Sequence, residues 1–196
     1  MSHRYCVIAP EHPVHGPYHN TEYGFPQRDE RILFERLALE IMQAGLSWEI
    51  VLKKRKALRK AFDRFDVRTV AAYTAADERR LMGDAGIIRN RLKIKAIIRN
   101  AGCLLEMRKS HKGFANWLAQ HHPLDKAQWV RLFKKRFSFT GGEITGEFLM
   151  SIGYLPGAHA KDCPAFRIVE KLAPPWTGAD ADRRNVPPSS PTAGHR

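Results

Sequence analysis

Apolar residues recur at helical spacing from about residue 29 to residue 172, and this periodicity is the strongest constraint on the fold. The spacing is clearest in two series, Leu33, Leu37, Ile41 and Ile94, Ile97, Ala101, Leu104. Strand-like alternation of apolar and polar residues is scarce. With 196 residues, the chain is long enough for one domain with a substantial core. The pattern therefore predicts an all-α domain.

The periodic segments divide the chain into a series of predicted helices. In chain order, we expect them over residues 29–44, 48–62, 74–82, 89–107, 113–121, 125–135, 143–152 and 164–172. The first is apolar on most faces, so it should be a central buried helix, ended by Gly45 in a C-cap role. The second should carry a row of basic residues on its exposed side, namely Lys53, Lys54, Arg55, Lys56, Arg59 and Lys60.

The two ends of the chain lack this periodicity. Residues 1–28 hold several prolines and aromatics, and we expect them to wrap over the surface as a loop-rich arm. From residue 173 onward, prolines mingle with Gly, Ser, Asp and Arg, a composition that buries too little surface to fold. We therefore predict one helical domain over residues 1–172 and a disordered tail over residues 173–196.

The charge balance indicates a polyanionic partner. The chain has 33 Lys and Arg against 20 Asp and Glu, a net charge of +13. A field of that sign concentrates phosphates and gains from counterion release, so nucleic acid is the favoured partner. The N-terminus has no apolar signal core, and no stretch approaches the roughly 18 apolar residues of a membrane helix. We expect a cytoplasmic protein that does not enter membranes.

A glycine-containing turn separates two helical patterns at residues 81–91. Gly86 permits a backbone conformation closed to other residues, and Ile87 and Ile88 can anchor the turn in the core. Backbone N–H groups at the start of the following helix can then point at a phosphate. Further positive charge comes from Arg89, Arg91, Lys93 and Lys95. This segment, about residues 74–105, resembles a helix-hairpin-helix; the alternative is an ordinary connection between helices with a solvated basic face.

Two pairs of residues suit a structural metal site. Cys6 and His19 lie in the arm, and His159 and Cys163 lie near the end of the fold. Two thiolates and two imidazoles satisfy tetrahedral zinc and leave no position for water. Such a site would tie the arm to the C-terminal segment. The alternative is that they are unrelated surface histidines and buried thiols; the third cysteine, Cys103, is expected in the core.

Glu40 interrupts the apolar central helix, where an unpaired carboxylate costs several kcal/mol and therefore needs a partner or a purpose. One purpose is recognition of a base edge, with Gln43 on the same side and with Trp48 and Tyr18 as stacking faces. The alternative is an ion pair with Arg36 at helical spacing.

Three sequence stretches closely resemble the signature of the 3-methyladenine DNA glycosylase I family. The first is Glu40 to Trp48 followed by Val51 to Arg55. The others are Tyr18 to Gly24, and Asp84 to Arg91 with Lys93-Ile94 and Asn100-Ala101. The resemblance covers about residues 4 to 163 in order.

The resemblance implies an all-helical helix-hairpin-helix glycosylase whose zinc ligands are Cys6, His19, His159 and Cys163. Its catalytic and base-binding glutamate falls on Glu40, and the substrate-binding residues on Tyr18, Glu22, Gln43 and Trp48. The DNA-backbone hairpin falls on Gly86, Ile88, Arg89, Asn90, Arg91 and Lys93. Family members excise 3-methyladenine from duplex DNA hydrolytically, without a water-activating aspartate or a lysine nucleophile, so a monofunctional, monomeric enzyme is implied.

The chain also departs from the family pattern at pocket positions. Ile8 stands where a tryptophan is typical, His15 where a tyrosine is usual, and Gly146-Glu147 where the family has Tyr-Ser; Gly142-Glu143 replaces a Pro-Thr or Thr-Thr pair. Each lost aromatic contact weakens stacking by ~1–3 kcal/mol. Two alternatives follow, a glycosylase with shifted lesion specificity and a catalytically altered helix-hairpin-helix DNA-binding protein. A zinc hydrolase is disfavoured because protein ligands fill all four metal positions.

Overall fold

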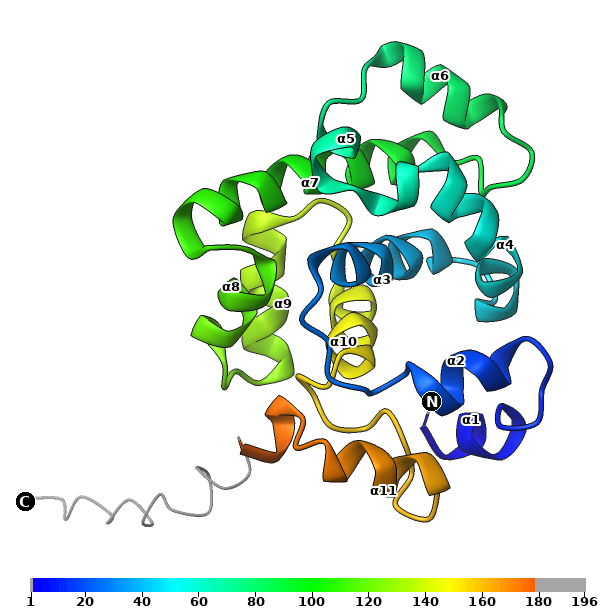
Figure 1. The fold of residues 1–196 in the computed structure, drawn as a ribbon, viewed down its shortest axis with the longest axis vertical. Coiled ribbons are helices and arrows are strands. Elements are labelled where there is room, and N and C mark those ends of the chain that lie inside the picture. Colours follow the sequence, from blue (N-terminus) through cyan, green and yellow to red (C-terminus); the bar gives the residue numbers. More distant parts are fainter. Residues whose placement is uncertain (1, 179–196) are drawn as a thin grey trace, which may run out of the picture.

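The computed structural model describes residues 2–178, which form helices joined by short connections with no strand among them (Figure 1). The helices are α1 (Ser2–Ile8), α2 (His15–Thr21), α3 (Glu30–Gln43), α4 (Trp48–Ala61), α5 (Val67–Ala71), α6 (Ala75–Gly83), α7 (Arg91–His111), α8 (Phe114–His121), α9 (Lys126–Arg136), α10 (Gly142–Ser151) and α11 (Pro164–Lys171), with a 3-10 turn at Asp63–Phe65. The all-α prediction is confirmed.

Helix α3 is the central element of the fold, as the sequence predicts. Every residue from Leu33 to Met42 is buried, because α4, α7, α8 and α10 all pack against it. The Asp29 side chain caps its N-terminus by accepting from the Ile32 N–H at 3.0 Å. At the other end Gly45 has a φ of +77°, a conformation that ends the helix at low cost for glycine.

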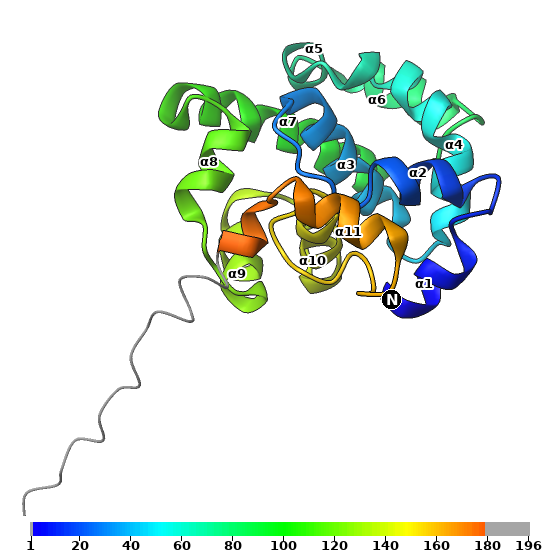
Figure 2. The ribbon, with the colours of Figure 1, turned by 60° about the horizontal axis from the view of Figure 1, so that its bottom comes forward.

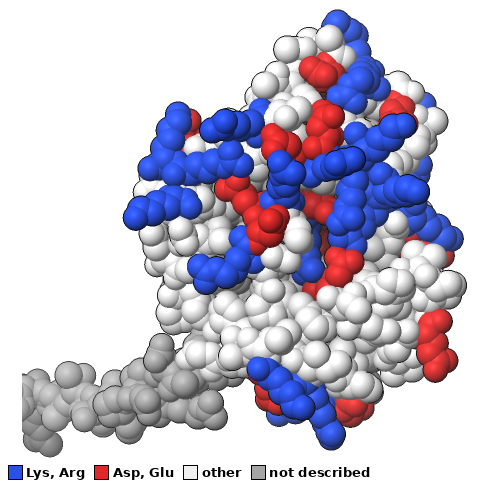
Figure 3. Space-filling view, in the orientation of Figure 1, with Lys and Arg blue, Asp and Glu red and all other residues white. Residues whose placement is uncertain are grey.

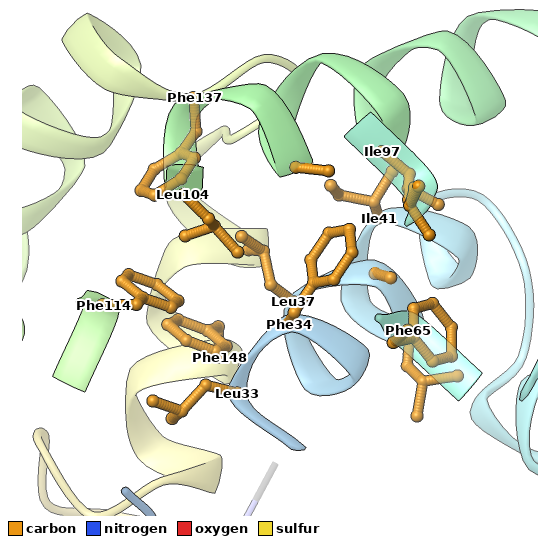
Figure 4. Close-up of a cluster of buried hydrophobic side chains, with 14 of the residues drawn as sticks. Leu33, Phe34, Leu37, Ile41, Phe65, Ile97, Leu104, Phe114, Phe137 and Phe148 are labelled. Atoms are coloured by element: carbon orange, nitrogen blue, oxygen red, sulfur yellow. The ribbon is translucent and has the colours of Figure 1, made fainter. Parts of the chain in front are cut away.

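The hydrophobic core surrounds α3. Figure 4 shows Leu33, Leu37 and Ile41 of α3 facing side chains from the 3-10 turn, from α7, α8 and α10, and from the end of α9. Those side chains include Phe65, Ile97, Leu104, Phe114, Phe137 and Phe148, all at most 5% exposed. A core of this extent holds α3 rigidly, so polar groups on α3 have fixed positions.

The ends of the chain are more ordered than their composition suggests. The predicted loop-rich arm contains α1 and α2, helices too short to give a periodic signal and stabilised by tertiary contacts. The predicted disorder is also wrong for residues 173–178, because the Trp176 N–H donates to the Gly153 carbonyl at 3.2 Å and its ring packs near Phe166. Residues 179–196 lie outside the described part of the chain.

The arm and the C-terminal helix are neighbours in space although they are far apart in sequence. Helices α1, α2 and α11 lie side by side at one end of the molecule, whereas α5 and α6 lie at the other (Figures 1 and 2). None of the helices in residues 2–178 is both long enough and apolar enough to cross a membrane.

Candidate functional site

A small pocket of about 130 Å³ lies where the arm meets α3, α10 and the start of α4. Pockets for drug-sized molecules occupy ~300–1,000 Å³, so this one suits a single small ring system. Its walls are mostly aromatic, and it has few polar groups. The residues that line it are Tyr5, Ile8, His15, Tyr18, Tyr23, Glu40, Gln43, Trp48 and Glu147. Four of the predicted residues, Tyr18, Glu40, Gln43 and Trp48, are therefore brought together.

Glu40 lies in the wall of this pocket and is only 4% exposed. Burial raises the pKa of its carboxyl well above the usual range, the nearby Glu147 charge raises it further, and Arg36 opposes both. Among the side chains that the structure describes, those of residues 4–178, none donates a hydrogen bond to it. Its oxygens are therefore available to a donor that enters the pocket.

Arg36 does not form the ion pair that the sequence allows. Its guanidinium donates instead to the backbone carbonyls of Glu22, at 2.7 Å, and Ser151. These bonds tie α3 to the arm and to the end of α10. The alternative in which Arg36 neutralises Glu40 by pairing with it is therefore wrong.

The aromatic faces of the pocket are fixed by their surroundings. Tyr18 is 3% exposed, and the guanidinium carbons of Arg36 and Arg55 each lie 5.9 Å from its ring centre. Trp48, the first residue of α4, meets Tyr18 edge-on at 5.1 Å between ring centres. The Ser47 side chain caps α4, which sets the direction from which Trp48 leaves the helix.

Glu22 does not contribute to the pocket, and the prediction that it binds substrate is corrected by its contacts. Both of its carboxylate oxygens accept from Arg55 at 2.7 Å. Burial acts to raise the pKa of the Glu22 carboxyl, but the bonds from Arg55 outweigh it and hold this pKa below its usual value. Glu22 and Glu35 together bind Arg55, so this carboxylate joins the arm to α3 and α4.

Tyr5 and Tyr23 line the pocket and were not predicted to do so, whereas Ile8, His15 and Glu147 line it at positions where the sequence departs from the family's pocket pattern. Tyr5 and Tyr23 meet edge-on at 5.9 Å between ring centres. The Tyr5 hydroxyl contacts His15 Nδ1 at 3.3 Å. Tyr5 and Tyr23 lie in or near short helices of the arm, so no periodic pattern in the sequence indicates which of their sides faces inward. The abundance of aromatic residues in the arm was the one sequence feature that could have indicated their role in the pocket.

The four predicted metal ligands converge at the base of the arm. Their ligand atoms all lie within 4.8 Å of one another. Cys163 Sγ is 3.8 Å from His19 Nε2 and 3.9 Å from His159 Nδ1, and Cys6 Sγ is 3.8 Å from His159 Nδ1. Ligand bonds of ~2.0–2.3 Å in a tetrahedron place sulfur and nitrogen about 3.6 Å apart. This group can hold a metal ion.

The surroundings of both histidines favour metal binding. His19 Nδ1 donates to Asn20 Oδ1 at 2.7 Å, which leaves the lone pair of Nε2 directed at the cluster. His159 Nε2 donates to the Tyr23 carbonyl at 2.7 Å, which leaves Nδ1 free for a metal. Such outer hydrogen bonds fix the tautomer and ring orientation of metal-bound histidines.

A second group of metal-binding residue types, His12, His15 and Glu49, lies beside the pocket. Its members have other partners. His12 Nδ1 accepts from the N–H groups of Val14 and His15, and Glu49 pairs with Lys53 at 2.6 Å. These contacts identify His12 as a cap at the start of α2.

The predicted hairpin joins α6 to α7, with Ile87 buried and Ile88 half-buried beneath it. Lys54 Nζ donates to the carbonyls of Ala85 and Gly86 at 3.1 and 3.0 Å, and the Asn90 side chain caps α7. The described contacts leave the N–H groups of Arg91 and Leu92 in the first turn unpaired, as expected at a helix start. They remain available to a phosphate oxygen.

Gly86 is needed for a different reason from the one predicted. Its φ is not positive; instead, an added Cβ would lie 3.0 Å from Asp84 Oδ1 and 3.3 Å from Ala57 Cβ. The close approach of the hairpin to α4, rather than an unusual backbone conformation, therefore favours glycine.

Lys93 is corrected from a DNA contact to a structural residue. It is 4% exposed, and its ammonium donates to the carbonyls of Met42 and Ala44 at 2.9 and 2.6 Å. Lys93 thus caps the C-terminus of α3, directly before the Gly45 turn. Arg89 and Arg91 are exposed, and Arg91 pairs with Glu78 at 3.3 Å.

Replacing Lys93 by methionine should lower the free energy of unfolding by about 1–3 kcal/mol, because two buried carbonyls lose their donor. Urea unfolding followed by circular dichroism measures the change. Lys95→Met is the matched control: Lys95 is exposed on the same helix and pairs with Glu78 at 3.8 Å, so its loss should cost less than about 0.5 kcal/mol. Equal effects in the two variants would contradict the capping role.

Comparison with known proteins supports the same family as the motifs. Residues 8–167 match the model of the methyladenine glycosylase family. The chain belongs to this family. Methyladenine glycosylases named DNA-3-methyladenine glycosylase in Haemophilus influenzae and Escherichia coli K12 are 36% and 38% identical to it. These alignments cover 81% of this chain and 96% and 94% of the relatives.

Solved structures of the family share the fold. The 3-methyladenine DNA glycosylase I of Staphylococcus aureus has a TM-score of 0.74 at 32% identity, covering 84% of this chain and 97% of its own. A variant of 3-methyladenine DNA glycosylase I solved in complex with 3-methyladenine also has a TM-score of 0.74, at 31% identity, covering 83% of this chain and 97% of its own. The resemblance predicted from the motifs is confirmed.

Proposed function

We propose that this methyladenine glycosylase is a DNA repair enzyme that excises 3-methyladenine by monofunctional hydrolysis of the N-glycosidic bond. The observation that carries the proposal is Glu40, a buried carboxyl in an aromatic pocket that no described side chain neutralises by a direct bond. An active-site pocket that accepts an extruded base needs a flat, apolar space with a few placed polar groups.

The chemistry required of the protein is limited. Methylation at N3 gives the adenine a positive charge, so the base departs without being protonated by the enzyme. The ionised Glu40 accepts a hydrogen bond from the base and stabilises its charge, while Tyr18 and Trp48 provide stacking faces and Gln43 adds an amide. Water then attacks the sugar, which leaves an abasic site in an unbroken strand.

We also propose that the ion in the Cys/His group is zinc and that its role is structural. Two thiolates with two neutral imidazoles are a donor set that zinc favours, and four protein ligands leave no position for a reacting molecule. The metal would hold α1 and α2 against the segment before α11, and thereby the pocket residues that α1 and α2 carry.

Duplex DNA containing the alkylated base is the proposed partner. Figure 3 shows Lys and Arg side chains gathered over the half of this face where α4 to α7 lie, whereas the half formed by the arm, α10 and α11 is mostly uncharged. The α6–α7 hairpin lies within that basic half, and its free N–H groups suit a phosphate.

Release of free base from methylated genomic DNA, followed by chromatography, tests the function. The expected result is 3-methyladenine released in proportion to enzyme, with abasic sites and no strand cleavage. The altered pocket positions Ile8 and His15 favour a second candidate, a helix-hairpin-helix DNA-binding protein without this activity. DNA binding without base release would support the second candidate and contradict the first.

Binding to undamaged duplex DNA should weaken steeply with salt, because phosphate contacts release counterions. Replacing the exposed Arg89 by alanine should weaken binding and reduce the slope of log K against log salt by about one. Fluorescence anisotropy over a salt series measures both. A flat salt response, or an Arg89→Ala slope equal to the wild-type slope, would contradict a phosphate contact at the hairpin.

A further inference from the structure

Glu147 adds a second carboxyl group to the base pocket. It lies on α10, at one of the positions where the sequence departs from the family pattern, and its side chain lines the pocket together with Glu40. The two carboxyls reach the same cavity from different helices, and the charge of Glu147 acts on Glu40. The pocket therefore contains two groups that can carry a negative charge.

Glu147 is held in place by a hydrogen bond inside the pocket. The Tyr23 hydroxyl donates to Glu147 Oε2 at 3.0 Å, and Tyr23 is itself only 6% exposed. The hydroxyl donor favours the ionised form of Glu147, although burial raises the pKa of this carboxyl overall. Glu147 has a fixed position and a donor that stabilises its charge, both of which are needed for recognition.

The lysine beside Gly146 does not pair with Glu147. Gly146 leaves room that Lys126 fills, since an added Cβ there would lie 2.7 Å from Lys126 Cε. The Lys126 ammonium pairs with Glu143 at 3.3 Å, outside the pocket. Among residues 2–178, no lysine or arginine forms an ion pair with either pocket carboxyl.

We propose that Glu147 is a specificity-determining residue which, together with Glu40, makes the pocket select purines that carry a formal positive charge over neutral purines of the same shape. A cationic ring attracts both carboxylates, and it relieves their mutual repulsion in a site of low dielectric. A neutral ring does neither. This inference rests on the proposed function, because it assumes that the pocket receives the base.

The test compares two small ligands that differ mainly in charge. The probes are 3-methyladenine, which is neutral, and 3,9-dimethyladeninium, whose positive charge is permanent and whose second methyl group replaces the sugar carbon. Quenching of tryptophan fluorescence or calorimetry gives the dissociation constant of each. In the wild type, the cation should bind more tightly than the neutral base.

Glu147→Gln should weaken binding of the cation about tenfold and change binding of the neutral base less than twofold, because the amide keeps the shape and removes the charge. Tyr23→Phe, which removes only the hydroxyl donor, should weaken cation binding by about threefold. The matched control is Glu143→Gln, which makes the same change one turn earlier on α10, at a side chain that is 87% exposed and does not line the pocket. Its charge acts on Glu147, but it lies in solvent, so this variant should change either constant less than twofold.

The inference is overturned if Glu147→Gln weakens the binding of both ligands equally. It is also overturned if Glu147→Gln and Tyr23→Phe both keep the wild-type preference for the cation. Base release by the wild type from methylated DNA is measured alongside. Activity with an unchanged charge preference overturns only the role of Glu147, whereas absence of base release overturns the proposed function.

Discussion

The Glu40→Gln variant is expected to release 3-methyladenine from methylated DNA at least about a hundredfold more slowly than the wild type. The Glu40 carboxylate lies on α3 and faces the pocket without a described donor, so the substitution removes a fixed negative charge from beside a cationic base. Loss of one preorganised electrostatic contact in a desolvated site typically costs about 10²–10³ in rate. Single-turnover base release, followed by chromatography, measures the change.

The same variant should be at least as stable as the wild type at neutral pH. Burial raises the pKa of Glu40 in the folded protein, so ionising it there costs free energy. The contribution of Glu40 to folding stability is complete below its pKa in the unfolded chain, near 4.3. This contribution is lost as pH rises through its pKa in the folded protein. Glutamine avoids that cost. Thermal unfolding at two pH values tests the sign, and a clear loss of stability at neutral pH would contradict it.

The raised pKa also sets the expected pH dependence of the wild type. Because the ionised Glu40 is the form that stabilises a cationic base, base release should fall as pH is lowered, at a pH above the usual range for glutamate. In the base-release measurements, Glu143→Gln is the control for removing one negative charge from outside the pocket. If it loses as much activity as Glu40→Gln, the effect does not come from the pocket.

The part of the fold that the sequence predicts is the part that obeys a periodic pattern. The long helices α3, α4 and α7 each bury a continuous apolar stripe, so their approximate ranges follow from residue spacing alone. Glu40 was identifiable for the same reason, because a carboxylate inside an apolar stripe contradicts the pattern. The four metal ligands could not be predicted as one site from residue spacing alone, because the spacing gives only two separate pairs. The family resemblance was needed to join them.

What could not be predicted depends on tertiary position. Lys93 lies in a basic run that looks solvated, and only the fold places its ammonium at the end of α3. Glu22 lies within a family motif, yet it binds Arg55 rather than a ligand. Tyr23 and Glu147 are distant in sequence and meet only in the folded pocket. Each of these roles arises from a contact between elements that no local pattern encodes.

Cys163→Ser is expected to lose the bound metal and to unfold at a markedly lower temperature. Serine is a poor zinc ligand, and the three remaining ligands come from two segments that are far apart in the sequence, so the metal is lost as the link between them. With free zinc a thousandfold above its dissociation constant, the metal contributes about 4 kcal/mol, which corresponds to roughly 8–16 °C for a domain of this size. Metal analysis by mass spectrometry and thermal unfolding measure the two effects.

Cys103→Ser provides the matched control, because Cys103 lies outside the cluster and its thiol contacts the Arg136 carbonyl, which a hydroxyl can also do. It should keep about one zinc per chain and the wild-type unfolding temperature. A chelator should lower the unfolding temperature of the wild type and of Cys103→Ser to that of Cys163→Ser, and leave Cys163→Ser unchanged, because one metal accounts for the whole difference. Full zinc occupancy in Cys163→Ser would show that the ion binds elsewhere, and the arm would then owe its position to the Glu22–Arg55 ion pair and the aromatic contacts around Tyr18.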